Sequence, residues 1–267
     1  MSDATDMPGR IVCERDGAVA HLIIDNASRH NSLDLAMWRQ ASELLVALSK
    51  DDGIRALVVS GRGGKSFAAG ADISKFDKER STPAEVDRYQ QISGAVYDGL
   101  VRFPKPTIAS IGGYCIGGGL AIATSCDIRI CGEEAQFALP AAKLGLGYAP
   151  DGFAALIDIV GAATAADIIY SARRFGAREA YDMRFVNHVI ATNERTSFVK
   201  EYAETISRNA PLTIALAKAT KLAAAENLRL RAGEHLNGMV DACYASEDYK
   251  EGRRAFGEKR SPVFLGR

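Results

Sequence analysis

Three consecutive glycines, Gly117 to Gly119, are the residues whose type and spacing most suggest chemistry in this sequence. They are followed by residues 120–124 (LAIAT), a stretch without a helix breaker. The pattern predicts a buried helix that starts at the glycines. Bare main-chain N–H groups at a helix N-terminus, together with the helix dipole, favour a negatively charged oxygen. The alternative is a tight strand-to-helix turn that only packs closely, and the triplet alone favours that alternative.

The segments around the glycines must position them. Residues 107–111 (TIASI) are apolar, rich in β-branched side chains and bounded by prolines and a glycine, so they predict a buried strand. A second small-residue stretch, residues 66–72 (SFAAGAD), follows a predicted strand at 54–60 and a glycine-rich turn. Strand, strand, helix and strand at this spacing indicate repeated β-β-α or β-α-β units.

The rest of the chain alternates in the same way and then becomes helical. Asp16-Gly17 between apolar runs predicts a hairpin, and Leu35, Trp38 and Leu45 lie at helical spacing. The further elements expected are helices at 34–49, 86–101, 153–160, 164–172, 177–183, 194–209, 211–226 and 229–246, and strands at 127–130, 135–139 and 186–190. The sequence therefore predicts an α/β core and a helical tail, with a boundary near residues 190–200.

Composition narrows the class of protein. The 267 residues are 47% hydrophobic and 25% charged, which is typical of a globular chain. Because 33 Lys and Arg balance 33 Asp and Glu, no bulk attraction to nucleic acid or to an anionic membrane is expected. No secretory signal, membrane-spanning run or metal-ligand cluster is apparent. The five cysteines form no CxxC motif and read as reduced and mostly buried, so we expect a cytoplasmic protein.

Taken together, these stretches resemble the enoyl-CoA hydratase/isomerase (crotonase) superfamily. The matching pieces occur in family order between about residues 11 and 264; they are VAHLIIDNASRHNSLD, SFAAGADI, KPTIASIGGYCIGGGLAIATSCDIRI, AQFALPAAKLGLGYAPDG, ARRFGAREAYDMRFVNHVI and EGRRAFGEKRSPVF. The resemblance implies a spiral of repeated β-β-α units with a C-terminal helical trimerisation region. It divides the chain into a core with the acyl-CoA site, residues 1–195, and an oligomerisation region, residues 196–267.

The resemblance also implies a site and a substrate class. The substrate would be an acyl-CoA thioester of fatty acid metabolism, with coenzyme A as part of it and no permanently bound cofactor. Backbone N–H groups of Ala71 and Gly118 would hold the thioester oxygen while an enolate forms. Oriented amides need no reorganisation when that oxyanion appears, and each contributes about 3–4 kcal/mol. The protein would form a homotrimer or a dimer of trimers.

Contacts to coenzyme A are implied at two places in the chain. Arg29, His30 and Ala69 belong to stretches that contact the cofactor in the family, although Arg29 could equally be a solvated loop charge. Phe256, Lys259 and Arg260 match a tail segment that reaches the CoA of a neighbouring subunit. Lysine suits phosphate as a point charge and arginine as a fork. The alternative for the tail is a merely basic C-terminus.

The sequence departs from the family at its two acid-base positions. The hydratases of the family carry two glutamates there, and this chain has Ala121 and Ala141. Alanine has no proton to give or take, so the paired-carboxylate chemistry of hydration is missing. None of the histidines sits in a motif where the family places its base, and a structural role is favoured for each. Cys115 and Cys126 flank the glycine stretch in apolar company, so inert burial is favoured over a nucleophile.

Two residues of the loop at 144–152 are candidates to replace the glutamates. Asp151 could act as a base or nucleophile, with a helix N-cap as the alternative. Tyr148 could orient the substrate or donate a proton, with wall packing as the alternative. Two classes of function stay open. One is an enzyme of isomerisation, hydrolysis or decarboxylation that uses Asp151, and the other is a non-catalytic acyl-CoA-binding protein.

Overall fold

The computed structural model describes residues 8–72, 75–79, 81–144, 147–225, 242 and 246–267. Two sheets organise these residues. The strands of the larger sheet are β1 (Arg10–Asp16), β2 (Val19–Asp25), β3 (Ala56–Gly61), β5 (Thr107–Ile111), β7 (Ile128–Gly132) and β10 (His188–Ile190), in the order β1-β2-β3-β5-β7-β10. Those of the smaller sheet are β4 (Ser66–Ala68), β6 (Tyr114–Ile116), β8 (Gln136–Ala138) and β9 (Arg174–Gly176), in the order β4-β6-β8-β9.

The larger sheet is parallel except at one edge. There β1 and β2 form the antiparallel hairpin that Asp16-Gly17 predicts, with Gly17 at a φ of 58° in the turn. The other neighbours in this sheet pair in parallel. In the smaller sheet β8 and β9 pair antiparallel. Parallel neighbours need crossover connections, and these bring the helices onto the sheet faces.

Successive passes of the chain build both sheets at once. The strands β3, β5 and β7 of the larger sheet are each followed directly by a strand of the smaller sheet, β4, β6 and β8. Helices α3 (Pro83–Val101), α4 (Gly118–Ser125) and α5 (Pro150–Val160) follow these pairs. This is the spiral of repeated β-β-α units that the sequence predicts, and the prediction is confirmed.

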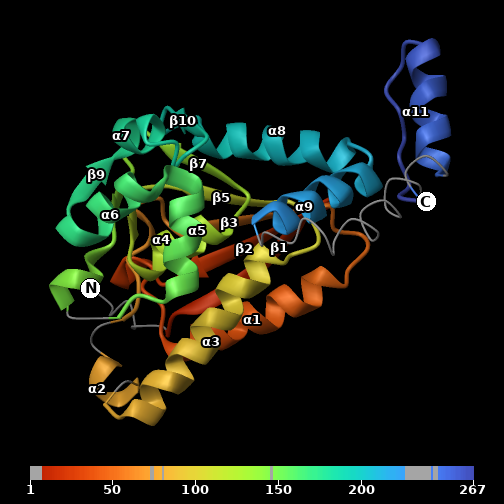
Figure 1. The fold of residues 1–267 in the computed structure, drawn as a ribbon. Coiled ribbons are helices and arrows are strands. Elements are labelled where there is room, and N and C mark those ends of the chain that lie inside the picture. The colour runs from red at the N-terminus through yellow and green to blue at the C-terminus, as the bar shows by residue number, and fades with distance from the viewer. Residues whose placement is uncertain (1–7, 73–74, 80, 145–146, 226–241, 243–245) are drawn as a thin grey trace, which may run out of the picture.

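Helices cover the two faces of the larger sheet unequally (Figure 1). On one face α1 (Leu35–Ser49) packs with α3, and the main core there includes the fully buried Trp38 and Phe67. On the other face α8 (Arg195–Arg208) lies across the sheet and buries Val199 and Ala203 against it. The remaining short helices are η1 (Ala27–Arg29), α2 (Phe76–Glu79), η3 (Pro140–Leu144), α6 (Ala162–Ser171) and α7 (Ala177–Asp182).

The C-terminal part consists of α9 (Pro211–Ala225) and α11 (Glu247–Gly257) among the described residues. A buried ion pair between Lys218 and Asp127, 2.7 Å long, ties α9 to the core. In contrast, α11 stands away from the sheets (Figure 1). The helix predicted at 229–246 lies outside the described residues apart from residues 242 and 246, and α11 was not predicted. The division at residues 195 and 196 stays a prediction.

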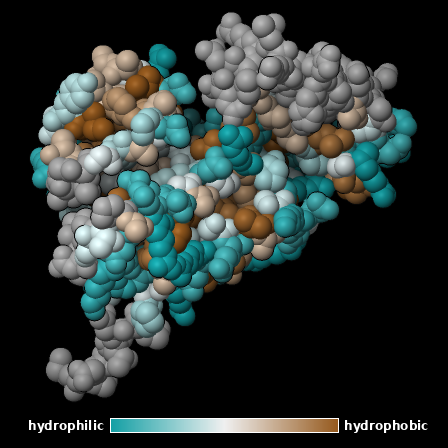
Figure 2. Space-filling view, turned by 60° about the horizontal axis from the view of Figure 1, so that its bottom comes forward, coloured by the Kyte–Doolittle hydropathy of each residue, from teal (hydrophilic) through white to brown (hydrophobic). Residues whose placement is uncertain are grey.

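Hydrophilic side chains predominate on the face of the molecule that Figure 2 shows, and hydrophobic ones are scattered among them. Among the helices that the structure describes, none has both the length and the hydropathy needed to cross a membrane.

Candidate active site

The glycine triplet forms the junction between β6 and α4. The helix begins at Gly118, and its N-cap, Gly117, has φ 54° and ψ −114°, a conformation that L side chains rarely adopt. All seven following residues of α4 are buried. The predicted buried helix at the glycines is therefore confirmed, and positive φ is required at Gly117 rather than at Gly118.

Close packing explains why small residues are needed after Gly117. A Cβ atom on Gly119 would lie 2.2 Å from the carbonyl oxygen of Ala68, which leaves no room for a side chain. A Cβ atom on Gly118 would lie 3.3 Å from Cζ2 of Trp38 and 3.3 Å from the hydroxyl of Tyr97. The helix start therefore packs directly on β4 and on two aromatic side chains.

Trp38 and Tyr97 are site residues that the sequence did not reveal as such. Their rings meet edge to face with centroids 5.4 Å apart, and Nε1 of Trp38 donates a hydrogen bond of 2.6 Å to the hydroxyl of Tyr89. The helical spacing that includes Trp38 indicated a core residue, which is correct. Only the fold shows that α1 and α3 deliver these rings to Gly118.

The second small-residue stretch runs beside the loop after β2. Ala71 and Leu33 form an isolated parallel β-bridge, in which Leu33 N–H donates to Gly70 O at 2.8 Å and Asp72 N–H donates to Leu33 O at 3.0 Å. Successive peptide groups of an extended chain point to opposite sides. The N–H of Ala71 therefore points away from Leu33.

The two small-residue stretches meet at Gly70. This residue has a φ of 94°, and a Cβ atom on it would lie 3.0 Å from Ile116 O and 3.3 Å from Gly118 N. Neither Ala71 N–H nor Gly118 N–H donates a hydrogen bond to another residue that the structure describes. Two main-chain donors on adjacent segments can together hold one developing negative charge on oxygen.

Two methyl groups lie where the resemblance places carboxylates. Ala121 is one turn into α4 and Ala141 is in η3, and each is 8% exposed. Pro140, which precedes Ala141, has its Cδ 4.0 Å from the position of a Cβ on Gly117. The η3 turn is therefore close to the helix start.

Asp151 is exposed at the start of α5 and is not the N-cap of this helix. The helix begins three residues earlier than predicted, at Pro150, so Ala149 is the N-cap and Asp151 lies in the first turn. Proline suits a first helical position because its missing N–H is not needed there. The N-cap alternative is therefore wrong, and the favourable contact of Asp151 is with the helix dipole.

Tyr148 is held just before α5 with its hydroxyl buried. Ring and hydroxyl atoms of Tyr148 lie 3.3–3.4 Å from the position of a Cβ on Gly152, and the ring packs against the main core. Among the residues that the structure describes, the hydroxyl has no hydrogen-bond partner. Burial raises the pKa of Tyr148 to about 12, so the group is a neutral donor at physiological pH.

The residues that the resemblance assigns to coenzyme A in the core lie beside Ala71. Ala69 N–H donates to His30 O at 3.0 Å, and the His30 ring meets Tyr114 edge to face at 5.8 Å. Arg29 extends towards Asp72, with Nη1 3.3 Å from Oδ2 of the carboxylate. The structure thus brings Arg29, His30 and Ala69 together around the segment that carries Ala71.

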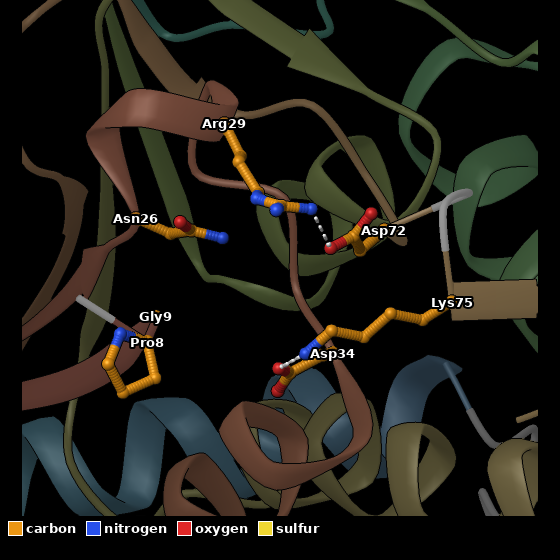
Figure 3. Close-up of a pocket in the computed structure, with 7 residues that line it drawn as sticks. All are labelled: Pro8, Gly9, Asn26, Arg29, Asp34, Asp72 and Lys75. Carbon is orange, nitrogen blue, oxygen red and sulfur yellow. Dashed lines mark hydrogen bonds and ion pairs between the residues drawn. The ribbon is translucent and has the colours of Figure 1, made fainter. Parts of the chain in front are cut away.

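A polar cavity of about 130 Å³ adjoins this segment (Figure 3). Across it, Arg29 points to Asp72 and Lys75 points to Asp34, and both pairs are joined by hydrogen bonds. The lining is completed by Pro8, Gly9 and Asn26. Asp34 also accepts a hydrogen bond from Met37 N–H at 2.9 Å as the N-cap of α1.

The three tail residues that the resemblance assigns to coenzyme A lie in and just after α11. Phe256 lies in α11, and Lys259 and Arg260 follow this helix. Arg260 is paired with Glu251 and Glu258, and α11 stands apart from α4 in Figure 1. One copy of the chain therefore does not bring these residues to Ala71 and Gly118. A contact with the CoA of a neighbouring subunit stays a prediction.

Three of the described cysteines, Cys115, Cys126 and Cys131, are buried as expected, whereas Cys13 is exposed. Cys115 and Cys126 are nearly inaccessible, and burial raises the pKa of each thiol, that of Cys126 to about 12. Such thiols are poor nucleophiles. Among the residues that the structure describes, no three His, Cys, Asp or Glu side chains gather as metal ligands would.

Known proteins of similar sequence share a family description. The model of the enoyl-CoA hydratase/isomerase family matches residues 14–267. The short-chain-enoyl-CoA hydratase of Clostridium acetobutylicum is 33% identical over 255 residues, covering 94% of this chain and 95% of that protein. The carnitinyl-CoA dehydratase of Escherichia coli K12 is 30% identical over 257 residues, covering 95% and 97%.

Solved structures agree with the sequence relatives. An enoyl-CoA hydratase/carnithine racemase from Magnetospirillum magneticum superposes with a TM-score of 0.89 at 33% identity, over 96% of each chain. An enoyl-CoA hydratase/isomerase family protein from Hyphomonas neptunium gives 0.91 at 27% identity, over 96% of this chain and 98% of the other. Because both the family model and these relatives span nearly the whole chain, the protein belongs to the enoyl-CoA hydratase/isomerase family.

Proposed function

We propose that this protein binds an acyl-CoA thioester and stabilises its enolate between the N–H groups of Ala71 and Gly118. The observation that carries the proposal is the meeting of two segments whose donors no described residue uses. Gly70 directly precedes Ala71, and Gly117 directly precedes Gly118. Both glycines have a positive φ, which turns the chain just before each donor. Donors fixed in this way keep their direction when charge develops, which is how an oxyanion is stabilised.

We also propose that hydration is not the efficient reaction of this site. Ala121 and Ala141 offer methyl groups where addition of water would need an acid and a base. The relatives named hydratases support the thioester and the fold. They do not supply the two missing carboxylates. Decarboxylation forms the enolate by loss of CO₂ and then needs one proton donor, and isomerisation needs one group that takes a proton and returns it, so both fit the site better. Hydrolysis would use the same two N–H groups for a tetrahedral oxyanion instead of an enolate.

The test uses acetoacetyl-CoA, a thioester that forms an enolate without help from the protein. The conjugated enolate absorbs in the near ultraviolet, so its pKa can be read free and protein-bound. Because hydrogen bonds to the charged form favour it, the proposed site lowers the pKa of the bound ligand. We expect a drop of about 2 units or more, given the size of an oxyanion-hole donor. An unchanged pKa on saturated protein would reject the proposal.

The proton donor that we propose for the site is Tyr148. Its hydroxyl is buried and has no partner in the described part of the chain, which costs the unliganded protein stability. With a pKa of about 12 it keeps its proton at neutral pH and is a donor, not a base. Asp151, exposed in the first turn of α5, is the proposed base. Tyr148 lies just before α5 and Asp151 in its first turn, and α5 contacts α4.

Tyr148→Phe separates stability from function. Removing an unpartnered buried hydroxyl should raise the free energy of unfolding of the unliganded protein by about 1–3 kcal/mol, because a desolvated donor is removed. The same change should weaken binding of acetoacetyl-CoA. Urea denaturation and ligand titration measure the two effects. Tyr181→Phe is the matched control, since Tyr181 is 47% exposed and its hydroxyl is solvated. A Tyr148→Phe variant that is less stable would contradict this account.

The assembly completes the proposal. We propose a homotrimer or dimer of trimers in which Phe256, Lys259 and Arg260 of one copy contact the CoA of the next. The position of α11 away from the core supports a contact between copies. Light scattering on the full chain should give a mass that is a multiple of three, and a stable monomer at micromolar concentration would contradict it.

A further inference from the structure

The segment that carries Ala71 has few main-chain attachments. It leaves the smaller sheet at the end of β4, and Ala69 N–H bonds to His30 O. The β-bridge with Leu33 supplies two more hydrogen bonds. An oxyanion donor must keep its direction closely, since a misplacement of about 1 Å can cost about 10²-fold in rate. The segment therefore needs further fixing.

Two ion pairs supply this further fixing, and both connect the segment that carries Ala71 with the stretch that carries Leu33 (Figure 3). Arg29, four residues before Leu33, pairs with Asp72, the residue after Ala71. Lys75, four residues after Ala71, pairs with Asp34, the residue after Leu33. Each stretch thus gives one cation and one carboxylate, and both carboxylates belong to the residues that directly follow the bridge.

The burial of the charges makes these pairs stronger than ordinary surface contacts. The side chains of Asp72 and Asp34 are 8% and 11% exposed, whereas those of Arg29 and Lys75 are 43% and 41% exposed. Partly buried pairs are screened by salt less than exposed pairs. The hydrogen bond to Asp34 raises the pKa of Lys75.

The space between the pairs is a cavity rather than packed core. Both ion pairs lie in the lining of the 130 Å³ cavity, so the gap that they cross is not filled by apolar side chains. The ion pairs therefore add charge contacts across this gap to the two main-chain hydrogen bonds of the β-bridge. Loss of one pair removes one of the contacts that hold the two stretches in their positions.

We propose that Arg29 and Lys75 are positioning residues that hold Ala71 N–H towards the substrate oxygen by pairing with Asp72 and Asp34. This inference depends on the proposed enolate site. It gives Arg29 a role different from direct contact with a phosphate of coenzyme A.

The experiment follows the pKa of bound acetoacetyl-CoA in variants of the full chain. Arg29→Gln and Lys75→Gln should each reduce the enolate-to-keto ratio at fixed pH by about 10- to 100-fold, as expected for a displaced donor. Asp34→Asn should match Lys75→Gln, because asparagine still caps α1 but carries no charge. Arg178→Gln is the control; it breaks an exposed pair with Asp182 and should change nothing.

Three further measurements separate positioning from other roles. Arg29→Lys should restore most of the effect, because lysine keeps the positive charge that pairs with Asp72. Arg29→Gln combined with Asp72→Asn should lose no more than the larger single effect, because both act through one pair. Acetoacetyl-pantetheine has no phosphates, and Arg29→Gln should reduce its enolate fraction by the same factor as for acetoacetyl-CoA.

The outcomes are distinguishable. If wild-type protein lowers the pKa but Arg29→Gln and Lys75→Gln do not raise it again, the inference is wrong and the enolate site stands. If Arg29→Gln acts on the CoA thioester and not on the pantetheine thioester, Arg29 binds phosphate and the inference is also wrong. If wild-type protein does not lower the pKa, the proposed function itself fails. Should Arg29→Gln unfold, Arg29→Lys and Asp34→Asn decide in its place.

Discussion

Gly118→Pro should raise the pKa of protein-bound acetoacetyl-CoA by about 2–3 units relative to Gly118→Ala. Removal of one oxyanion donor costs about 2.7–4 kcal/mol, and one pKa unit corresponds to about 1.36 kcal/mol. Proline fits the position because Gly118 is the first residue of α4, where no intrahelical bond needs its N–H. The measurement is the ultraviolet absorbance of the enolate against pH on saturated protein.

The alanine variant is the matched control for this substitution. In both variants the new Cβ lies 3.3 Å from Trp38 and from the hydroxyl of Tyr97, so both share this crowding. Proline adds Cγ and Cδ, and its Cδ takes the place of the amide hydrogen. Only the proline variant lacks the N–H. Urea denaturation shows whether both remain folded. Equal pKa values in the two variants would mean that Gly118 N–H does not face the thioester oxygen.

Much of the frame of this site could be predicted from local sequence. The glycine triplet predicts the start of a buried helix, because glycine adopts the positive φ found at Gly117 more readily than other residues do. Helix α4 begins at the next residue, Gly118. The hairpin at Asp16-Gly17 and the strands around residues 54–60 and 107–111 follow from turn chemistry and apolar runs. These are short-range signals, since each depends on neighbours within one element.

What the sequence did not reveal depends on contacts between distant elements. Trp38 and Tyr97 reach Gly118 only because α1 and α3 pack on the same face of the sheet. The pairing of Arg29 with Asp72 joins residues 43 positions apart, so no local pattern predicts it. The start of α5 was misplaced because Pro150 and Asp151 both suit a first turn, and the chain begins the helix at the proline.

Hydration of crotonyl-CoA should be very slow in the natural protein and should be restored by Ala121→Glu combined with Ala141→Glu. Each positioned acid or base contributes about 10²–10⁴-fold, and the unmodified site has neither at these positions. We expect the double variant to exceed the wild-type rate by about 10²-fold or more. Loss of the ultraviolet absorbance of the enoyl thioester follows the reaction.

The pattern among the variants tests the mechanism more sharply than the rate of any one of them. Addition of water needs a base for the water and an acid for the α-carbon, so Ala121→Glu alone and Ala141→Glu alone should gain much less than the double variant. Ala142→Glu, at an exposed position next to Ala141, adds the same charge outside the buried site and should gain nothing. If wild-type turnover matches that of an efficient hydratase, another acid-base pair must do this work. Tyr148 and Asp151 would then be the first residues to replace. Tyr148 offers a buried donor just before α5 and Asp151 an exposed carboxylate in its first turn, and α5 packs on α4.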